Sequence, residues 1–349
     1  MTKNQNITLN DIAKALNVSK VTISKALRNH PDISVRMKEL IKKTALEMGY
    51  SPNFVARNLS AKKTNTIGLV VPKIAHYFFG SVIESIYDAA FENNYEIILT
   101  VTQEDSEKES KYIKSLMSMR VDGIIISISQ NTVDCSVFNK IKEREIPLVF
   151  LDRVIDCGDF TCVTVKDYSG SYKATEHAIK MGYTKLAHLA GPMEINISRE
   201  RCKGFKDALS DNNIELKEDW ILHGGFSEKD GYKGLMEIFE SGDLPEFIFT
   251  VTYPVALGVY AAAQKLGLRI PDDIDVMCFG DSDVNRFISP SLSCVYQPTE
   301  KLGQEAVRLL IEQINNYDSF NPVKVELPTD LIIRETCSKK YKDNLQTLS

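Results

Sequence analysis

Near the start of the chain, a group of side chains has the types and spacing needed to contact a DNA duplex. Lys20 and Lys25 can donate hydrogen bonds to guanine O6 and N7, and Val21 can pack on a thymine methyl group. Neighbouring polar side chains suit phosphate oxygens, which position a protein without reading sequence; they are Thr22, Ser24 and Asn29. A single lysine of this kind is often only a solvent-exposed surface charge, so DNA binding is indicated by the whole set of residues and not by any one of them.

These side chains belong to a segment with the spacing of a short helix, residues 18–27. Val18, Ile23 and Leu27 recur on one side of it, and Ser19 can cap its start. The preceding segment, 8–17, predicts another helix that ends at Asn17, a residue that tolerates the left-handed conformation of a tight turn. The two segments together predict a helix-turn-helix whose second helix faces DNA.

The first of these helices begins at a variant of the capping box, Thr8-x-x-Asp11, with a shorter acid at the fourth position. A third helix is predicted over about 35–48, with Ser34 as its N-cap and Gly49 as its terminator. Five of its apolar residues should close a small core over the first two helices: Val35, Leu40, Ile41, Ala45 and Met48. Pro52 then interrupts the chain, and residues 54–61 predict a helix too short to be stable alone.

Charge is divided unevenly along the 349 residues. Residues 1–63 carry 12 Lys and Arg against four Asp and Glu, a balance of +8, whereas the whole chain is −5, which leaves −13 for residues 64–349. A basic head with regular apolar periodicity on an acidic body indicates that the head binds nucleic acid and that the body has another task. The hydrophobic content of 43% and charged content of 26% are typical of globular domains.

From Thr66 onward, short apolar runs alternate with amphipathic segments. The predicted strands are Ile67–Val71, Glu96–Val101, Gly123–Ser127, Pro147–Leu151, Leu186–Ala190, Phe247–Val251 and Asp275–Phe279. The predicted helices are Phe79–Asn93, Glu107–Met119, Ser169–Met181, Arg199–Asn213, Glu228–Ser241, Pro254–Leu266 and Lys301–Asn316. This alternation predicts an α/β fold of parallel sheets covered by helices on both faces, and its length favours two lobes.

The cysteines and histidines give no sign of a metal or cofactor. The seven cysteines are odd in number, scattered and without C-x-x-C spacing, and the five histidines lack metal-ligand spacing. We therefore expect reduced thiols, with neither disulfides nor zinc. The polar first 20 residues and the absence of a long apolar run predict no signal peptide and no membrane span, which favours a cytoplasmic protein.

Several short motifs follow one another in a fixed order over residues 7 to about 335. In the head they are Thr8-x-x-Asp11-Ile12-Ala13, Val18-Ser19-x-x-Thr22-Ile23-Ser24, Leu46-Glu47-Met48-Gly49-Tyr50-Ser51-Pro52-Asn53 and Ala56-Arg57-Asn58-Leu59. In the body they are Thr66-Ile67-Gly68-Leu69-Val70-Val71-Pro72, Phe150-Leu151-Asp152-Arg153, His188-Leu189-Ala190-Gly191-Pro192, Arg201-x-x-Gly204-Phe205, Ala256-Leu257-Gly258 and Ser289-Pro290-x-Leu292. Together they resemble the lactose-repressor (LacI/GalR) family.

The resemblance implies an N-terminal three-helix helix-turn-helix headpiece at 1–51, a hinge helix and linker at 52–65, an effector-binding and dimerisation domain at 66–336 and a polar tail at 337–349. That domain would resemble a periplasmic sugar-binding protein, with an N-lobe of about 66–164 and 291–322 and a C-lobe of about 165–290 and 323–336. The family also implies a homodimer on a pseudo-palindromic operator in double-stranded DNA, where two recognition helices enter successive major grooves. No leucine-rich heptads follow residue 335, which favours a dimer over a tetramer.

By the same resemblance, Leu59 is an apolar wedge that two hinge helices insert into the minor groove, with Val55 packing against its symmetry mate. The alternative is a leucine that rests on the sensor surface. Lys20, Val21 and Lys25 occupy positions that set base preference in the family. The full set of expected DNA contacts is Thr8, Leu9, Ser19, Lys20, Val21, Thr22, Ser24, Lys25, Asn29, Asn53, Val55, Ala56, Arg57 and Leu59.

The effector pocket departs from the family pattern. Most members have Asn-Asp before x-x-Ala-Leu-Gly where this chain has Thr252-Tyr253, and Gly280 stands where a sugar-binding Asp is common. The expected effector contacts are Phe78, Phe79, Asp152, Arg201, Phe226, Thr252, Tyr253 and Asp281. Aromatic faces with Arg and Asp suit a sugar ring, which favours a carbohydrate-derived small molecule.

Each of these assignments has an alternative. The phenylalanines could be ordinary core, and Asp281 could pair with a neighbouring helix or strand end. Arg201 could hold a carboxylate or phosphate, or form an ion pair that closes the lobes.

Three classes of protein compete for this pattern. A ligand-controlled transcriptional regulator, most simply a repressor, explains head, hinge and sensor together. A solute-binding protein of the same sensor fold would need export and no basic head. An enzyme is disfavoured because the chain has no G-x-G-x-x-G, G-K-[ST] or G-x-S-x-G motif and no Cys/His pairing. The sequence leaves open whether the protein represses or activates transcription, because it does not contain the position of the operator. It also leaves open whether the ligand weakens or strengthens operator binding.

Overall fold

A computed structural model describes residues 7–27, 29–50, 63–75 and 77–337. The chain divides into two units, Met1–Thr64 and Asn65–Ser349, which we call the headpiece and the sensor. The predicted hinge helix lies outside the described residues, and so do the DNA contacts expected on it: Asn53, Val55, Ala56, Arg57 and Leu59.

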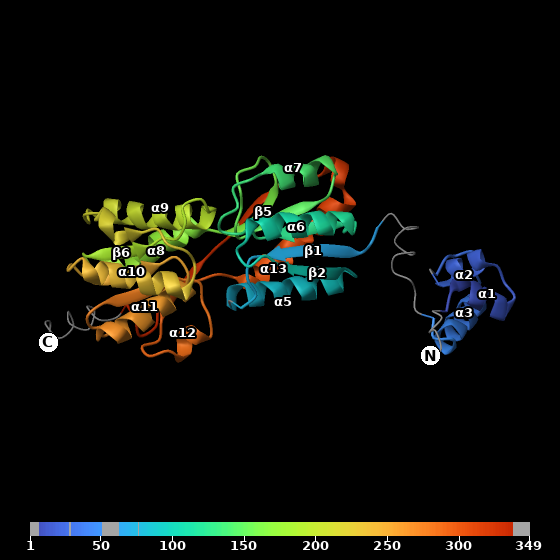
Figure 1. Cartoon of the computed structure of the whole chain (residues 1–349), viewed down its shortest axis with the longest axis horizontal. Coiled ribbons are helices and arrows are strands. Elements are labelled where there is room, and N and C mark those ends of the chain that lie inside the picture. The colour runs from blue at the N-terminus through green and yellow to red at the C-terminus, as the bar shows by residue number, and fades with distance from the viewer. Residues whose placement is uncertain (1–6, 28, 51–62, 76, 338–349) are drawn as a thin grey trace. The chain divides into compact units, whose positions relative to one another are not determined.

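The headpiece contains α1 (Leu9–Leu16), α2 (Lys20–Leu27) and α3 (Val35–Glu47) (Figure 1). Helix α1 starts at the predicted capping box, where Thr8 Oγ1 donates to Asp11 Oδ2 at 2.7 Å and Thr8 N donates to the same oxygen at 2.8 Å. Asn17 follows with a φ of 50°, which confirms the left-handed turn. The three helices bury a common core of Ile12, Ala13, Ile23, Ala26, Ile41 and Ala45.

Two residues predicted for this core are exposed instead. Val35 is 70% exposed and Leu40 is 46% exposed. The reason is helix geometry: successive residues are about 100° apart around the axis, so a helix that turns Ile41 and Ala45 inward points Leu40 sideways. Val35 is the first residue of α3, six residues before Ile41, and therefore lies on a different side of the helix.

The sensor has two lobes, each built on a six-stranded sheet. The N-lobe strands are β1 (Thr66–Val71), β2 (Glu96–Val101), β3 (Gly123–Ile126), β4 (Leu148–Leu151), β5 (Thr161–Val165) and β11 (Lys324–Leu327). They are parallel and lie in the order β11-β5-β4-β3-β1-β2. One face of the sheet packs on α5 (Tyr77–Glu92) and α13 (Thr299–Asn315), the other on α6 (Ser106–Ser118) and α7 (Ser136–Glu143).

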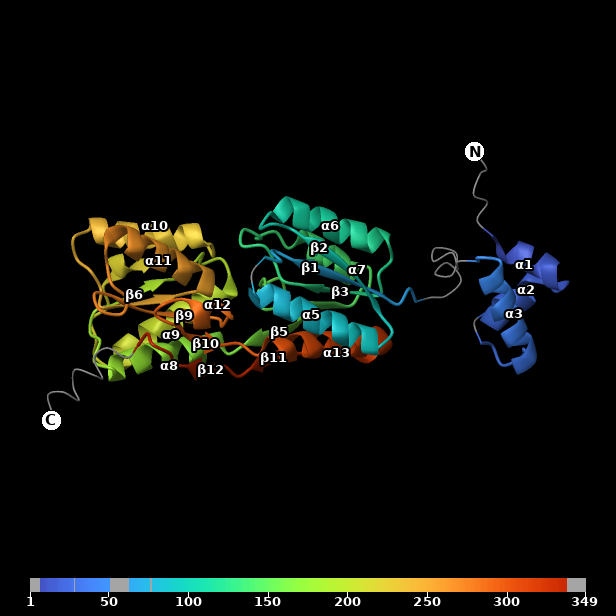
Figure 2. The same ribbon diagram turned by 90° about the horizontal axis from the view of Figure 1, so that it is seen from below.

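The C-lobe repeats this plan. Its strands are β6 (Leu186–Leu189), β7 (Ile221–Leu222), β8 (Phe247–Thr250), β9 (Asp275–Phe279), β10 (Ser293–Tyr296) and β12 (Asp330–Ile332), in the order β12-β10-β9-β8-β6-β7, with β12 antiparallel to β10. Figure 2 shows α10 (Glu228–Glu240) and α11 (Tyr253–Leu266) on one face and α8 (Asp167–Lys180) and α9 (Asn196–Asp211) on the other. The short helix α12 (Val284–Phe287) follows β9.

The chain passes between the lobes at points that partly differ from those expected. The first passage follows β5 near residue 166, close to the predicted position. The second follows β10 near Gln297 and the third follows β11 near Pro328, because β10 belongs to the C-lobe sheet and β11 to the N-lobe sheet. The boundaries predicted at 290 and 323 are therefore wrong by several residues. Neither strand was predicted, since both are short and β11 alternates exposed and half-buried residues at a sheet edge.

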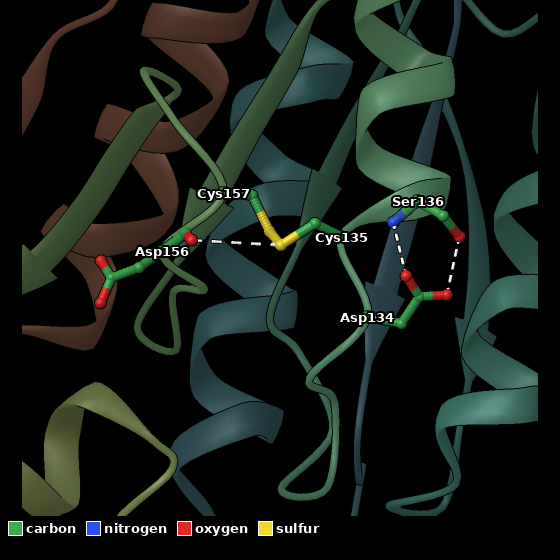
Figure 3. The surroundings of a disulfide bond; sticks show 5 residues. All are labelled: Asp134, Cys135, Ser136, Asp156 and Cys157. Atoms are coloured by element: carbon green, nitrogen blue, oxygen red, sulfur yellow. Dashed lines mark hydrogen bonds between the residues drawn. A yellow bond between two sulfur atoms is a disulfide. The ribbon is translucent and has the colours of Figure 1, made fainter.

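A disulfide joins Cys135 and Cys157, which corrects the prediction that all cysteines are reduced. The two residues lie 22 positions apart in the chain, but their Cα atoms are 5.6 Å apart. Cys135 precedes α7, where Asp134 Oδ1 accepts from Ser136 N at 2.8 Å, and Cys157 lies in the loop between β4 and β5 (Figure 3). Sequence spacing could not show this proximity, because it arises from the tertiary packing of two loops. The other five cysteines are buried free thiols.

The buried residue His188 gives the C-lobe a pH dependence. Its ring lies between those of Phe205 and Phe249, at centroid distances of 5.1 and 5.2 Å, and its Nδ1 donates to the Phe249 carbonyl oxygen at 3.0 Å. Burial lowers the pKa of His188 to about 3. In the unfolded chain the imidazole has its ordinary pKa of about 6.5. The neutral folded form therefore stabilises the lobe above that value, and the contribution is lost as the pH falls from about 6.5 toward 3.

We expect the free energy of unfolding to fall by about 1.4 kcal/mol for each pH unit in this range through His188 alone. Urea unfolding at several pH values between 4 and 7 measures the slope. His188→Gln, which keeps a donor for Phe249 but does not titrate, should lower the slope by about one proton. An unchanged slope would show that His188 is already protonated in the folded lobe.

No helix in the described ranges is long and apolar enough to cross a lipid bilayer.

Candidate functional site

The first candidate site is the exposed start of α2. Ser19 Oγ accepts a hydrogen bond from Thr22 N at 3.0 Å, which confirms Ser19 as the cap of this helix. Lys20 is exposed, and Val21 is 63% exposed although it is apolar. The opposite side of α2 is held in the headpiece core by Ile23. A rigid helix thus presents a lysine and a bare valine side by side, which suits contacts with base edges in a major groove.

The remaining polar residues of this segment differ in their exposure and in whether they already have a partner within the headpiece. Lys25 Nζ forms an ion pair with Asp32 Oδ2 at 2.8 Å, so its ammonium group is already engaged within the headpiece. Ser24 is half-buried, and Asn29 is exposed with a φ of 58° in the left-handed region. Lys20 is therefore the better candidate for a contact with a base. Lys25 could make such a contact only if its ion pair with Asp32 were broken or shared.

Two predicted DNA contacts have structural tasks in the headpiece. The hydroxyl of Thr8 is bonded to Asp11 in the capping box. The hydrogen bonds from Thr8 also lower the pKa of Asp11, which keeps the carboxylate ionised. Leu9 is half-buried and packs against the core. Contacts of these residues with DNA stay a prediction.

The second candidate site is a cavity between the lobes, at the carboxyl ends of the central strands. This is the edge at which open parallel sheets bind ligands. Its open volume is about 40 Å³, well below the roughly 300–1,000 Å³ of typical ligand pockets. The residues that line it are Phe78, Phe79, Asp152, Arg153, Ile197, Arg201, Phe226, Thr252, Tyr253, Pro254, Phe279, Gly280 and Gln297. Seven of the eight predicted effector contacts are among them.

Hydrogen bonds between the lobes explain why the cavity is small. Tyr77 N, in the N-lobe, donates to Tyr253 Oη of the C-lobe at 2.8 Å. The side chain of Asn196, in the C-lobe, accepts from Val154 N at 2.9 Å and donates to the Asp152 carbonyl oxygen at 3.1 Å. The sensor is therefore in a closed conformation, and Tyr253, one of the departures from the family pattern, is one of the residues that close it.

Arg201 is saturated by partners within the C-lobe. Its guanidinium is fully buried, contacts Asp167 Oδ1 at 2.7 Å through Nε and Nη2, and donates from Nη1 to the Val251 carbonyl oxygen at 2.6 Å. It also lies 3.6 Å from the centre of the Phe279 ring. Because both ion-pair partners belong to one lobe, this pair does not close the lobes. Burial raises the pKa of Asp167 to about 7 despite the opposing charge of Arg201.

Asp152 and Arg153 follow β4 directly and are among the residues that line the cavity. Arg153 is 3% exposed, donates from Nη1 to both carboxylate oxygens of Glu104 at 2.9 and 3.0 Å, and lies 4.3 Å from the centre of the Phe226 ring. Its role was missed, although a charged residue directly after an apolar strand was a usable signal. Burial raises the pKa of Asp152, while Arg201 and Arg153 oppose the shift.

Asp281 does not line the cavity, which corrects its assignment as an effector contact. Its Oδ2 pairs with Arg334 Nη2 at 2.9 Å, and its Oδ1 accepts from Asn285 Nδ2 at 3.2 Å. The pairing matches the alternative of a neighbouring structural partner. Gln297, at the second passage between the lobes, lines the cavity instead and had not been predicted.

The described residues thus form a helix-turn-helix headpiece and a two-lobed α/β sensor with a cavity between its lobes. Two family models match this division. Residues 8–53 match the bacterial regulatory proteins of the lacI family, and residues 64–339 match the periplasmic binding proteins and sugar binding domain of the LacI family. The chain therefore belongs to the LacI family of transcriptional regulators.

Curated relatives and solved structures agree with this assignment. The NTD biosynthesis operon regulator NtdR of Bacillus subtilis is 33% identical over 94% of this chain and 99% of its own length. The transcriptional repressor PurR of Vibrio vulnificus is 32% identical over 95% of this chain and 99% of its own length. The lac repressor dimer bound to operator and the anti-inducer ONPF has the same fold, with a TM-score of 0.84 at 24% identity over 95% of this chain and 99% of that chain.

Proposed function

We propose that this protein is a transcriptional repressor that binds a pseudo-palindromic operator in double-stranded DNA as a homodimer. A small, carbohydrate-derived effector in the interlobe cavity would control its affinity for the operator. The observation that carries the proposal is the exposed pair Lys20 and Val21 on a capped recognition helix, in one chain with a closable sensor. The activity would be regulatory and not enzymatic, and would take place in the cytoplasm.

Three features support binding of DNA by the headpiece. The balance of +8 in residues 1–63 favours a polyanion, whereas the −13 of the remaining chain does not. The relative PurR is a transcriptional repressor, and the similar lac repressor structure is a dimer on its operator. The alternative is a solute-binding protein of the same sensor fold, but this function does not explain the presence of the capped helices in the headpiece.

Exposed apolar side chains on the sensor support the homodimer. Phe287 on α12 is 83% exposed, Val284 one turn earlier is 43% exposed, and Phe91 on α5 is 81% exposed. A single exposed apolar residue is common, but neighbouring ones such as Val284 and Phe287 on α12 are typical of a surface that another chain covers. An isologous interface would place two copies of each patch around a two-fold axis, which is the symmetry that a palindromic operator requires.

The decisive experiment selects bound sites from random DNA with the full chain and then titrates sugars and their derivatives against the recovered site. We expect an inverted repeat with half-sites about one helical turn apart, released or tightened by one class of compound. A specific site that is not palindromic would overturn the dimer, and recovery of no specific site would overturn the function of the headpiece.

Lys20→Ala should relax preference at one base pair of each half-site by about 1–3 kcal/mol, because a bidentate contact to guanine is lost. Binding of the selected operator and of a set of single-base variants would be compared by gel shift at fixed salt. Lys14→Ala, which removes the same charge from an exposed position on α1, is the matched control and should affect all sequences alike. A uniform loss for Lys20→Ala as well would reassign Lys20 to a phosphate.

A further inference from the structure

The charged groups around the closed cavity do not balance. Arg153 is paired with Glu104 at 2.9 Å, and Arg201 is paired with Asp167 at 2.7 Å. All four side chains are at most 11% exposed. Each guanidinium thus has a carboxylate of its own. Asp152 is a third carboxylate, and it lines the cavity, whereas Glu104 and Asp167 are not among the lining residues.

Asp152 is the group left over. The residue is 4% exposed and its side chain lines the cavity. Its backbone is fixed on both sides, since Asp152 N donates to the Val163 carbonyl oxygen at 2.9 Å and its own carbonyl oxygen accepts from Asn196 at 3.1 Å. Among the described residues, no hydrogen bond reaches either carboxylate oxygen. A buried carboxylate with no donor is costly, so the group either takes up a proton, the direction in which burial shifts its pKa, or receives a cation or donor from outside.

Two buried donors at the same place also lack partners. Gln297 is 6% exposed and lines the cavity, and its Nε2 has no acceptor in the described part of the protein. Arg153 Nε is likewise buried without an acceptor within the described residues, although its Nη1 is bonded to Glu104. A buried donor without an acceptor has lost its hydrogen bonds to water without replacement, which is energetically unfavourable. A ligand that fits here brings oxygen acceptors toward Gln297 and Arg153.

We propose that the effector is an amine-bearing sugar whose ammonium group pairs with Asp152 and whose hydroxyl oxygens accept hydrogen bonds from Gln297 and Arg153. The aromatic rings of Phe79 and Phe226 then cover the C–H faces of the sugar ring. This inference rests on the proposed effector-controlled function and names the chemical class of the effector.

An acidic effector is disfavoured by the same contacts. A phosphate or carboxylate could accept hydrogen bonds from Arg153 Nε and Gln297 Nε2, but it would place a second negative charge beside the Asp152 carboxylate. A neutral sugar can donate hydroxyl groups to Asp152 but adds no positive charge to the partial compensation that Arg201 and Arg153 provide. An amine supplies both the donor and the charge.

The test measures thermal stabilisation of the full chain by a panel of amino monosaccharides and disaccharides. Each is paired with its N-acetylated form and with the parent sugar, and sugar phosphates and putrescine complete the panel. We expect the strongest ligand to carry a free amine and to bind roughly 10- to 100-fold more weakly once acetylated, the loss expected for a charged hydrogen bond. A preference for a neutral or phosphorylated sugar, for putrescine alone, or no binding by any amine-bearing sugar would overturn the proposal.

Asp152→Asn removes the charge and is the sharpest variant. Asp152 has a φ of 62°, and asparagine tolerates that left-handed conformation, so the backbone should keep its course. We expect the variant to lose the preference for the free amine over the acetylated form. Asp283→Asn, which removes the same charge from an exposed position outside the cavity, should keep that preference. Retention of the preference by Asp152→Asn would contradict the pairing.

Operator binding without ligand separates this inference from the proposed function. If the full chain selects a specific site but no amine-bearing sugar binds, only the effector class is wrong. If no specific site is selected, the regulatory function itself fails, whatever the sensor binds.

Discussion

Replacing Arg201 by methionine is expected to lower the free energy of unfolding of the C-lobe by about 3–5 kcal/mol. Arg201 is 1% exposed and lies 2.7 Å from Asp167, which is 4% exposed. Methionine keeps apolar volume beside Phe279 but leaves the Asp167 carboxylate buried without its cation. Removal of one member of a buried pair costs more than the pair itself contributes, because the remaining charge stays out of water.

The effect should depend on pH in a defined direction. Burial already raises the pKa of Asp167 to about 7 with Arg201 present, and loss of Arg201 removes the main opposing influence. A carboxyl group with a pKa above its unfolded value favours the folded state when it is protonated. The destabilisation by Arg201→Met should therefore be smaller at pH 5 than at pH 8.

Urea unfolding followed by tryptophan fluorescence measures this change. Trp220 is the only tryptophan of the chain and is buried in the C-lobe, so its signal reports the lobe that contains Arg201. The double variant Asp167→Leu with Arg201→Met replaces the pair by apolar groups and should recover most of the loss. If the double variant is as unstable as the single one, packing and not the unpaired charge is the cause.

Reduction of the disulfide between Cys135 and Cys157 is expected to lower the free energy of unfolding of the N-lobe by about 3 kcal/mol. The crosslink closes a segment with a sequence separation of 22, which restricts the unfolded chain more than the folded one. Denaturant unfolding followed by circular dichroism, with and without dithiothreitol, measures the difference. The variant Cys135→Ser with Cys157→Ser should unfold like the reduced protein and show no response to reductant.

Thiol counting provides an independent check of the crosslink. Under denaturing, non-reducing conditions the protein should expose the five free cysteines to alkylation, and after reduction all seven. Seven reactive thiols before reduction, together with unchanged stability in dithiothreitol, would contradict the disulfide.

Local signals explain why the headpiece and the central strands could be predicted. The capping pair Thr8 and Asp11, and Asn17 in the turn, act within a few residues, and each is found where expected. Strand β1 is buried on both faces, so it appears in the sequence as one continuous apolar run. In contrast, β11 lies at a sheet edge with alternating exposed and half-buried residues, and short apolar runs do not mark such a strand.

The lining residues that could be predicted for the candidate effector site are those at motif positions, because these positions place them at neighbouring strand ends. Its errors arise from contacts that are distant in sequence. Asp281 pairs with Arg334, which lies 53 residues later beyond the third passage between the lobes. The partners of Arg153 and Arg201 lie 49 and 34 residues away, and no local pattern could have assigned each guanidinium its own carboxylate.

The small volume of the closed cavity has a kinetic consequence. A space of about 40 Å³ cannot admit a sugar, so a ligand enters only after the hydrogen bonds of Tyr253 and Asn196 have opened. The same opening step would then precede both binding and release of a ligand. At high ligand concentration the observed association rate would therefore reach a plateau equal to the opening rate. A bound molecule remains enclosed until the same bonds break. Under the proposed function, the residence time of an effector would therefore be set by the opening rate of the protein, and an effector would stay bound for a time after its surrounding concentration has fallen.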